Sequence, residues 1–261
     1  MDWQSNLLLH AQTAYPQECC GLLIQAGSEK LYMACRNSAN QPEQDFVIHP
    51  EDLAMFESMG EIVGICHSHP DASSKPSERD IYNANALKAE YPNADWHIAS
   101  WPEGDIHSFT PSGEAYPLIG RPFIHGVMDC YTLVRDYYSQ ALGITLPDYE
   151  RSDLWWEGEQ ELYLDNFESA GFYKLCSGAP DEIANTQLEV GDVILMQILS
   201  DRVNHAALYI GDGIILQHLY GKLSQRDVFG GYWLRCTRLV IRHNQLIDLD
   251  MAKSLAKELK R

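Results

Sequence analysis

The chain has 261 residues, of which 45% are hydrophobic, and a formal net charge of −18 at pH 7. This length and apolar content predict two ordinary domains with cores of their own. The negative charge argues against binding to nucleic acid phosphates or to anionic membrane surfaces. No apolar run approaches the ~18 residues of a membrane-spanning helix, and the first residues lack the basic segment of a signal peptide. We therefore expect no signal peptide, no membrane insertion and a protein made in the cytoplasm.

The first half of the chain alternates short helical and strand patterns. Apolar residues at helical spacing predict a helix over residues 2–14, which Tyr15-Pro16 ends. Runs rich in β-branched and aromatic residues predict strands, and prolines and glycines separate them. The predicted strands cover residues 20–25, 31–36, 45–48, 62–66, 96–100 and 106–110, and further helices cover residues 50–59 and 77–90. These elements form a first domain over residues 1–112.

Two histidines follow the predicted strand at residues 62–66. Since alternate strand residues point to the same face, His67 and His69 would project two imidazoles side by side. After a loop, Ser77 is placed to cap a helix, and Asp80 lies in the first turn of that helix. Two imidazoles and one carboxylate form the open three-ligand set of catalytic zinc. Ser-x-x-Asp alone, however, is also a common helix start that resembles a capping box.

The order His-x-His-Pro, six residues, Ser, two residues and Asp is that of the JAMM (MPN-plus) metalloprotease motif, which the first domain resembles. The resemblance implies that His67, His69 and Asp80 are ligands of Zn²⁺. It also implies that Glu18, just before an apolar strand, is the general base. Ser77 is implied to help hold the tetrahedral intermediate.

The second half of the chain starts after a linker at residues 113–122. Residues 127–138 carry an apolar helical stripe, and Asp129 is placed to cap that helix. Cys130 would then lie at the helix N-terminus, where the dipole lowers the pKa of a thiol and favours the thiolate. The alternative is a cysteine buried for packing.

A predicted hairpin lies further along the chain. His205 lies on its first strand, and Gln217 and His218 lie on its second strand. A cysteine at a helix N-terminus, a histidine on a strand and a polar group on the next strand form the arrangement of papain-like thiol catalysis. The sequence leaves open which of Gln217 and His218 is the third group, because neighbouring strand residues point to opposite faces.

These segments resemble the NlpC-type cysteine peptidases, which cut peptidoglycan stem peptides. The resemblance lies in Asp129-Cys130, in Gly191-Asp192-Val193 and in the run from His205 to Gly213. It implies that Cys130 is the nucleophile and that His205 is the general base and then the acid. Phe123 occupies the place of a tyrosine that the family usually carries ahead of the cysteine.

Two further segments complete the second half. Residues 148–168 hold eight acidic side chains and one Arg around Leu154-Trp155-Trp156, which predicts an acidic helix with two core indoles or, alternatively, a wall of the substrate cleft. The peptidase-like domain covers residues 123–243, and residues 244–261 form a C-terminal helix with an apolar stripe.

The order of the two motifs in one short chain resembles the tail-tip assembly proteins of lambda-like siphophages. The implied fold is α+β or α/β with two domains: a JAMM-like mixed sheet with flanking helices, then a papain-like fold with a central antiparallel sheet. The implied role is tail-tip assembly with peptidoglycan cleavage at genome entry. Other phage tail-tip proteins and peptidoglycan peptides would be the partners, in the host cytoplasm during assembly and then in the virion tail.

Two alternative functions remain open at this point. The chain could be a structural tail protein whose peptidase sites are weak or vestigial. It could also be a bacterial JAMM enzyme that processes a ubiquitin-like protein, although the second, NlpC-type domain argues against that alternative.

Overall fold

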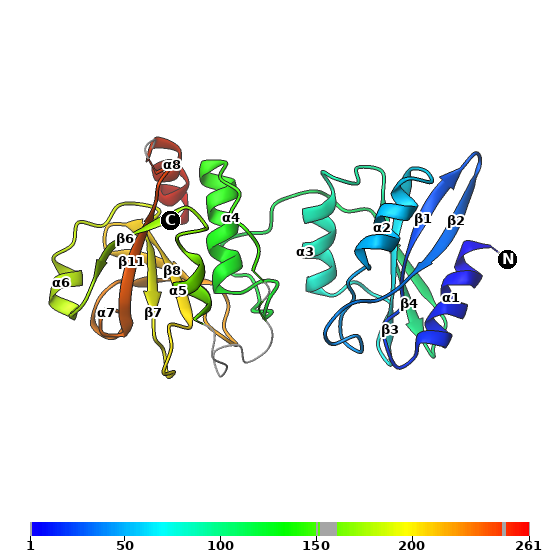
Figure 1. Cartoon of the computed structure of the whole chain (residues 1–261), viewed down its shortest axis with the longest axis horizontal. Helices are drawn as coiled ribbons and strands as arrows, with labels where there is room; N and C mark the ends of the chain where they lie inside the picture. Colours follow the sequence, from blue (N-terminus) through cyan, green and yellow to red (C-terminus); the bar gives the residue numbers. More distant parts are fainter. Residues whose placement is uncertain (1, 150, 152–160, 247–248, 261) are drawn as a thin grey trace. The chain divides into compact units, whose positions relative to one another are not determined.

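The computed structural model describes residues 2–149, 151, 161–246 and 249–260 (Figure 1). The chain divides into two compact units, Met1–Ala115 and Tyr116–Arg261. The segment Leu154-Trp155-Trp156 lies outside the described residues. Within the described ranges, no helix combines the length and the apolar character that a membrane crossing requires.

The first unit is built on a five-stranded mixed sheet of order β2-β1-β3-β4-β5. β3 and β4 are parallel, and the other neighbours are antiparallel. A parallel pair needs a crossover connection, which here contains a helix. This mixed sheet confirms the predicted fold class of the first half. The strands are β1 (Cys20–Ala26), β2 (Glu29–Cys35), β3 (Ile62–Pro70), β4 (Asp95–Trp101) and β5 (Ile106–Phe109).

Helices cover both faces of this sheet (Figure 1). Leu7 and Ala11 of the first helix pack with Leu23 of β1 on one face. On the opposite face, Phe56 and Ala84 of the other two helices pack in a second cluster with neighbouring strand residues. Because successive side chains of a strand point to opposite faces of the sheet, and helices cover both faces, the central strands are buried on both sides. The helices are α1 (Trp3–Ala14), α2 (Pro50–Glu57) and α3 (Glu78–Leu87).

Residues 45–48 do not form the predicted strand, so that prediction is wrong. A single isolated bridge joins Asn37 to Ile48. The side chain of Asn37 satisfies backbone groups of this segment: its Nδ2 donates to the carbonyl of Asp45 at 2.9 Å, and its Oδ1 accepts from the N–H of Val47 at 3.0 Å. These side-chain hydrogen bonds satisfy backbone groups that would otherwise pair with a neighbouring strand, so the segment needs no strand partner.

The second unit is built on a six-stranded sheet of order β10-β9-β8-β7-β11-β6. All its pairs are antiparallel, which confirms the predicted central antiparallel sheet. β6, β10 and β11 are strands beyond those predicted from the sequence, although the apolar run Leu239-Val240-Ile241 in β11 is a strand signal. The strands are β6 (Phe172–Ser177), β7 (Val193–Met196), β8 (His205–Gly211), β9 (Ile214–Gln217), β10 (Gln225–Val228) and β11 (Thr237–His243).

Helices also cover both faces of the second sheet. Val193 and Leu195 of β7 pack in the cluster that contains residues of α4 and α8, whereas Ile194 and Met196 pack with Ile183 of α6. A strand buried on both faces has a continuous apolar sequence, as β7 does. The helices are α4 (Cys130–Leu142), α5 (Leu162–Asn166), α6 (Pro180–Ala184), α7 (Gly231–Cys236) and α8 (Leu249–Leu259).

Candidate functional site

Three possible metal ligands converge in the first unit. The Nε2 atom of His67 lies 3.1 Å from Asp80 Oδ1, and the Nε2 atom of His69 lies 3.3 Å from Asp80 Oδ2. The two Nε2 atoms are 3.1 Å apart. Tetrahedral zinc with bonds of about 2.0–2.1 Å separates its ligand atoms by roughly 3.4 Å. The size and the chemistry of this donor set therefore fit Zn²⁺.

Neighbouring groups orient the two imidazoles. His69 Nδ1 donates to the backbone carbonyl of Ser73 at 2.7 Å, which leaves the lone pair on Nε2. The ring of His67 stacks on Phe46 with centroids 4.5 Å apart and meets the edge of Trp96 at 5.9 Å. Burial acts to raise the pKa of Asp80, but hydrogen bonds from His67 and His69 outweigh it and hold the pKa well below its usual range. The site thus presents an ionised carboxylate beside two imidazoles.

Glu18 lies next to this cluster. It comes just before β1, whose Cys20 pairs with His67 of β3. Burial raises the pKa of the Glu18 carboxyl to about 8, and it interacts electrostatically with His69 and Asp80. A carboxyl whose pKa lies near neutral pH is suited to accept and return a proton.

Ser77 has the capping contacts that its spacing to Asp80 predicts. Its Oγ accepts from the N–H of Asp80 at 3.2 Å and donates to Asp80 Oδ2 at 2.7 Å. Asp80 Oδ2 also accepts from the N–H of Ser77 at 2.7 Å, which completes a capping box at the start of α3. These bonds orient the carboxylate of the candidate metal site, and a role of Ser77 at a tetrahedral intermediate remains a prediction.

A cavity of about 420 Å³ in the second unit contains the predicted thiol site. Cys130 and His205 both line it, and so does His218. The ring of Phe123 contacts His218, with centroids 5.1 Å apart, and brings no hydroxyl group into the cavity. The structure thus brings the predicted nucleophile and the predicted base to one cavity, although no hydrogen bond joins them.

The partner of the His205 imidazole is Gln217. His205 Nε2 lies 3.0 Å from Gln217 Oε1, and Gln217 Nε2 donates to Asp227 Oδ2 at 2.7 Å. Because the carboxylate of Asp227 can only accept, the amide oxygen of Gln217 faces His205, and His205 Nε2 is the donor. The lone pair is then on Nδ1, as a general base requires. Of the two residues that the sequence left open, Gln217 is therefore the one that hydrogen-bonds His205, and its role as the third catalytic group remains a prediction.

Burial acts on both members of the thiol site. It raises the pKa of the Cys130 thiol to about 11, opposite to the lowering that a helix N-terminus predicts, and the charge of Asp129 adds to the increase. Burial also lowers the pKa of His205 to about 4. Desolvation disfavours both charged forms, so the resting site holds a neutral thiol and a neutral imidazole at pH 7.

Arg151 holds the N-terminus of α4, which carries Cys130. Its Nε donates to Asp129 Oδ2 at 2.6 Å, and both side chains are 2% exposed. The guanidinium also donates to the carbonyl of Gly126 and to Thr132 Oγ1. Arg151 was not among the residues predicted from the sequence, although it is the single Arg within the acidic segment 148–168.

We expect Arg151→Met to destabilise the protein by about 3–5 kcal/mol, because it leaves the buried carboxylate of Asp129 without its partner. Urea unfolding followed by tryptophan fluorescence measures this loss. Arg202→Met is the matched control: its ion pair with Glu161 is about 30% exposed on both sides, so its removal should cost about 0–1 kcal/mol. Equal stability losses in the two variants would contradict this role of Arg151.

Comparisons with known proteins agree with the division of the chain into two units. Residues 1–110 match the family of prokaryotic homologs of the JAB domain, and residues 120–242 match the NlpC/P60 family. A JAB1/MPN domain protein from Archaeoglobus fulgidus is 23% identical and covers 44% of this chain and 93% of its own, with a TM-score of 0.27, too low to add to the assignment.

Two curated relatives cover most of the chain. The tail tip assembly protein K of Escherichia phage N15 is 40% identical over 242 residues, which are 92% of this chain and 93% of that protein. The protein of the same name from Escherichia phage lambda is 40% identical over 195 residues, which are 74% of this chain and 88% of that protein. The chain therefore belongs to the tail tip assembly protein K family and joins a JAB-type domain to an NlpC/P60 domain.

Proposed function

We propose that the protein is a component of phage tail-tip assembly that also carries a cysteine peptidase for peptidoglycan stem peptides and a second, zinc-dependent peptidase site. The names of its relatives support the tail role, with other tail-tip proteins as partners and the virion tail as its final location. The observation that carries the thiol peptidase is the hydrogen-bonded series His205, Gln217 and Asp227 at a cavity that also holds Cys130.

The thiol site can perform acyl transfer with these groups. His205 Nδ1 takes the proton of the Cys130 thiol as the sulfur attacks the carbonyl carbon of a peptide bond. A C–S bond forms and the C–N bond breaks, while His205 returns the proton to the leaving amine. Water then attacks the thioester with His205 as base, which releases the acid and restores the thiol. Gln217 Oε1 accepts from Nε2–H throughout and stabilises the imidazolium that forms.

In the first unit, His67, His69 and Asp80 would hold Zn²⁺. When bound, the ion acts as a Lewis acid and supplies an activated nucleophile from water at neutral pH. The carboxylate of Glu18 takes up and returns protons beside the ligands. Ser77 and the start of α3 keep Asp80 in position, because they occupy one of its oxygens.

A second candidate function is that of a structural tail component whose thiol site is unused. The observation in its favour is the state of Cys130, whose side chain is buried and whose pKa is raised to about 11. In this case the arrangement of Cys130, His205 and Gln217 would serve packing alone, and the protein would not cut the wall.

Incubation of the purified full-length chain with peptidoglycan separates the two candidates. The masses of released products are read in four samples: untreated, with a chelator, with iodoacetamide, and with both. We expect stem-peptide fragments that iodoacetamide abolishes and the chelator leaves in place. No fragment in any sample would favour the structural candidate, and fragments abolished by the chelator alone would assign the cleavage to the first unit.

We expect Gln217→Leu to slow the release of fragments by about 10- to 100-fold, since it removes the hydrogen bond that fixes the His205 tautomer. The control His218→Leu changes a residue of the same cavity that does not hydrogen-bond His205. Initial rates at equal protein concentration test both variants. A larger loss in the His218 variant would give the third position to His218 instead.

A further inference from the structure

A phenol hydroxyl lies in contact with the Cys130 sulfur, beside the backbone of Ala206. The hydroxyl of Tyr163 lies 3.1 Å from Cys130 Sγ, and this pair is buried. Tyr163 belongs to α5, so it reaches the sulfur from a segment 33 residues further along the chain. The proposed peptidase reaction uses Cys130, His205 and Gln217 and leaves this contact without a role.

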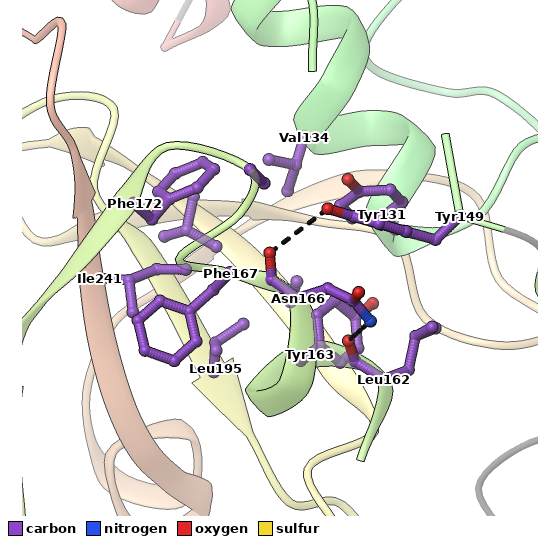
Figure 2. A pocket seen from close by; sticks show the side chains of 13 residues that line it. Tyr131, Val134, Tyr149, Leu162, Tyr163, Asn166, Phe167, Phe172, Leu195 and Ile241 are labelled. Atoms are coloured by element: carbon purple, nitrogen blue, oxygen red, sulfur yellow. Dashed lines mark hydrogen bonds between the residues drawn. The ribbon is translucent and has the colours of Figure 1, made fainter. Parts of the chain in front are cut away.

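Packing fixes where the Tyr163 hydroxyl lies. The side chain lines the thiol cavity and also a neighbouring apolar pocket, where Figure 2 shows it beside Leu162 and Asn166. Its ring meets Tyr131 edge-on, with centroids 6.1 Å apart. A ring held between two cavities can place its hydroxyl on the sulfur with little loss of entropy, because it has few rotatable bonds.

The chemistry of the pair decides which atom donates once the thiol ionises. Burial, together with the nearby Cys130 and Asp129, raises the pKa of Tyr163 well above its usual value. The phenol therefore keeps its proton when the sulfur loses its own, and the thiolate becomes the acceptor. A buried anion without donors is strongly disfavoured, and a hydrogen bond to a charged acceptor is about twice as strong as a neutral one.

We propose that the Tyr163 hydroxyl is a further catalytic group of the NlpC/P60 domain, which donates a hydrogen bond to the Cys130 thiolate and so promotes its formation. This inference rests on the proposed peptidase function and assigns to Tyr163 a role that neither the sequence motif nor the comparisons contain. Phe123, on the same cavity, has no hydroxyl that could do the same.

Alkylation of Cys130 tests the proposal without a substrate. The full-length chain and its Tyr163→Phe variant are treated with iodoacetamide from pH 7 to pH 10, and the labelled Cys130 peptide is followed by mass spectrometry. Loss of one charge-assisted hydrogen bond should slow the labelling by about tenfold across this range. Tyr149→Phe is the matched control, since its hydroxyl donates to the backbone carbonyl of Asn166 at the same pocket (Figure 2). It also contacts Ser169 Oγ, and the variant should label at the wild-type rate.

The direction of the change separates this role from simple packing. If Tyr163 only shields the sulfur, the variant labels Cys130 faster than the wild type. Equal or faster labelling therefore overturns the proposal. If Tyr163→Phe does not fold, 3-fluorotyrosine at position 163 keeps the shape and makes the phenol a stronger donor. Labelling of Cys130 should then be faster than in the wild type, and an equal or slower rate overturns the proposal.

Digestion of peptidoglycan distinguishes a failure of this inference from a failure of the proposed function. If the wild type releases fragments and Tyr163→Phe releases them at the same rate, the peptidase stands and the catalytic role of Tyr163 is wrong. If the wild type releases none, the peptidase proposal is wrong, and the labelling rates alone decide whether Tyr163 acts as donor to the sulfur.

Discussion

Cys130→Ala is expected to abolish the release of stem peptides from peptidoglycan, with a rate reduction of about 10⁴-fold or more. The reaction needs a sulfur that can form the thioester, and among the described residues that line the cavity Cys130 is the one cysteine. Product masses and initial rates with the purified full-length variant measure the loss. The side-chain cap of Asp129 on the N–H of Thr132 should survive, because alanine is also accepted at the first helical position.

Cys176→Ala is the control for this experiment. Cys176 is another free cysteine, partly exposed on β6, and it does not line the cavity. Its variant should digest peptidoglycan at the wild-type rate. Wild-type digestion by Cys130→Ala would contradict the nucleophile assignment and would favour the structural candidate for the second unit.

His67→Ala is expected to reduce the zinc content from about one ion per chain to background. The change leaves one imidazole and one carboxylate, and two ligands are too few for a stable zinc site of the three-ligand type. Elemental analysis after gel filtration gives the metal content. Digestion of peptidoglycan by the second unit should persist in this variant, because the two units have separate cores.

His107→Ala serves as the matched control for the metal experiment. His107 lies on β5 of the same sheet and is not among the three grouped ligands. It should retain about one zinc per chain. If His67→Ala keeps the wild-type zinc content, the ion is bound elsewhere. If the unsubstituted chain holds no zinc, the assignment of a zinc site is wrong.

The features of the two candidate sites that depend on the repeat of a strand or a helix could be predicted from the sequence. The side chains of His67 and His69 share a face because strand residues alternate with a period of two. The place of Asp80 in the first turn of α3 follows from its spacing of three residues after the N-cap Ser77. The helix at Cys130 and the strand at His205 followed from apolar patterns in the same way. These features depend on neighbours within a few positions of the chain.

The remaining parts depend on contacts that the sequence does not reveal. Asn37 satisfies the backbone of residues 45–48 from another loop, so an extended apolar pattern did not become a strand. Gln217 could be preferred over His218 only once the position of Asp227 was known. The pKa of Cys130 rises because packing around α4 removes water, which opposes the local effect of the helix dipole.

The division of the chain after Ala115 has a genetic consequence. The candidate metal ligands and Glu18 all precede this point, and Cys130, His205, Gln217, Asp227 and Tyr163 all follow it. A recombination event between the codons for residues 115 and 116 would therefore exchange one whole set of chemical groups together with the core that supports it. Such an exchange would leave the core and the candidate site of the other unit unchanged in sequence.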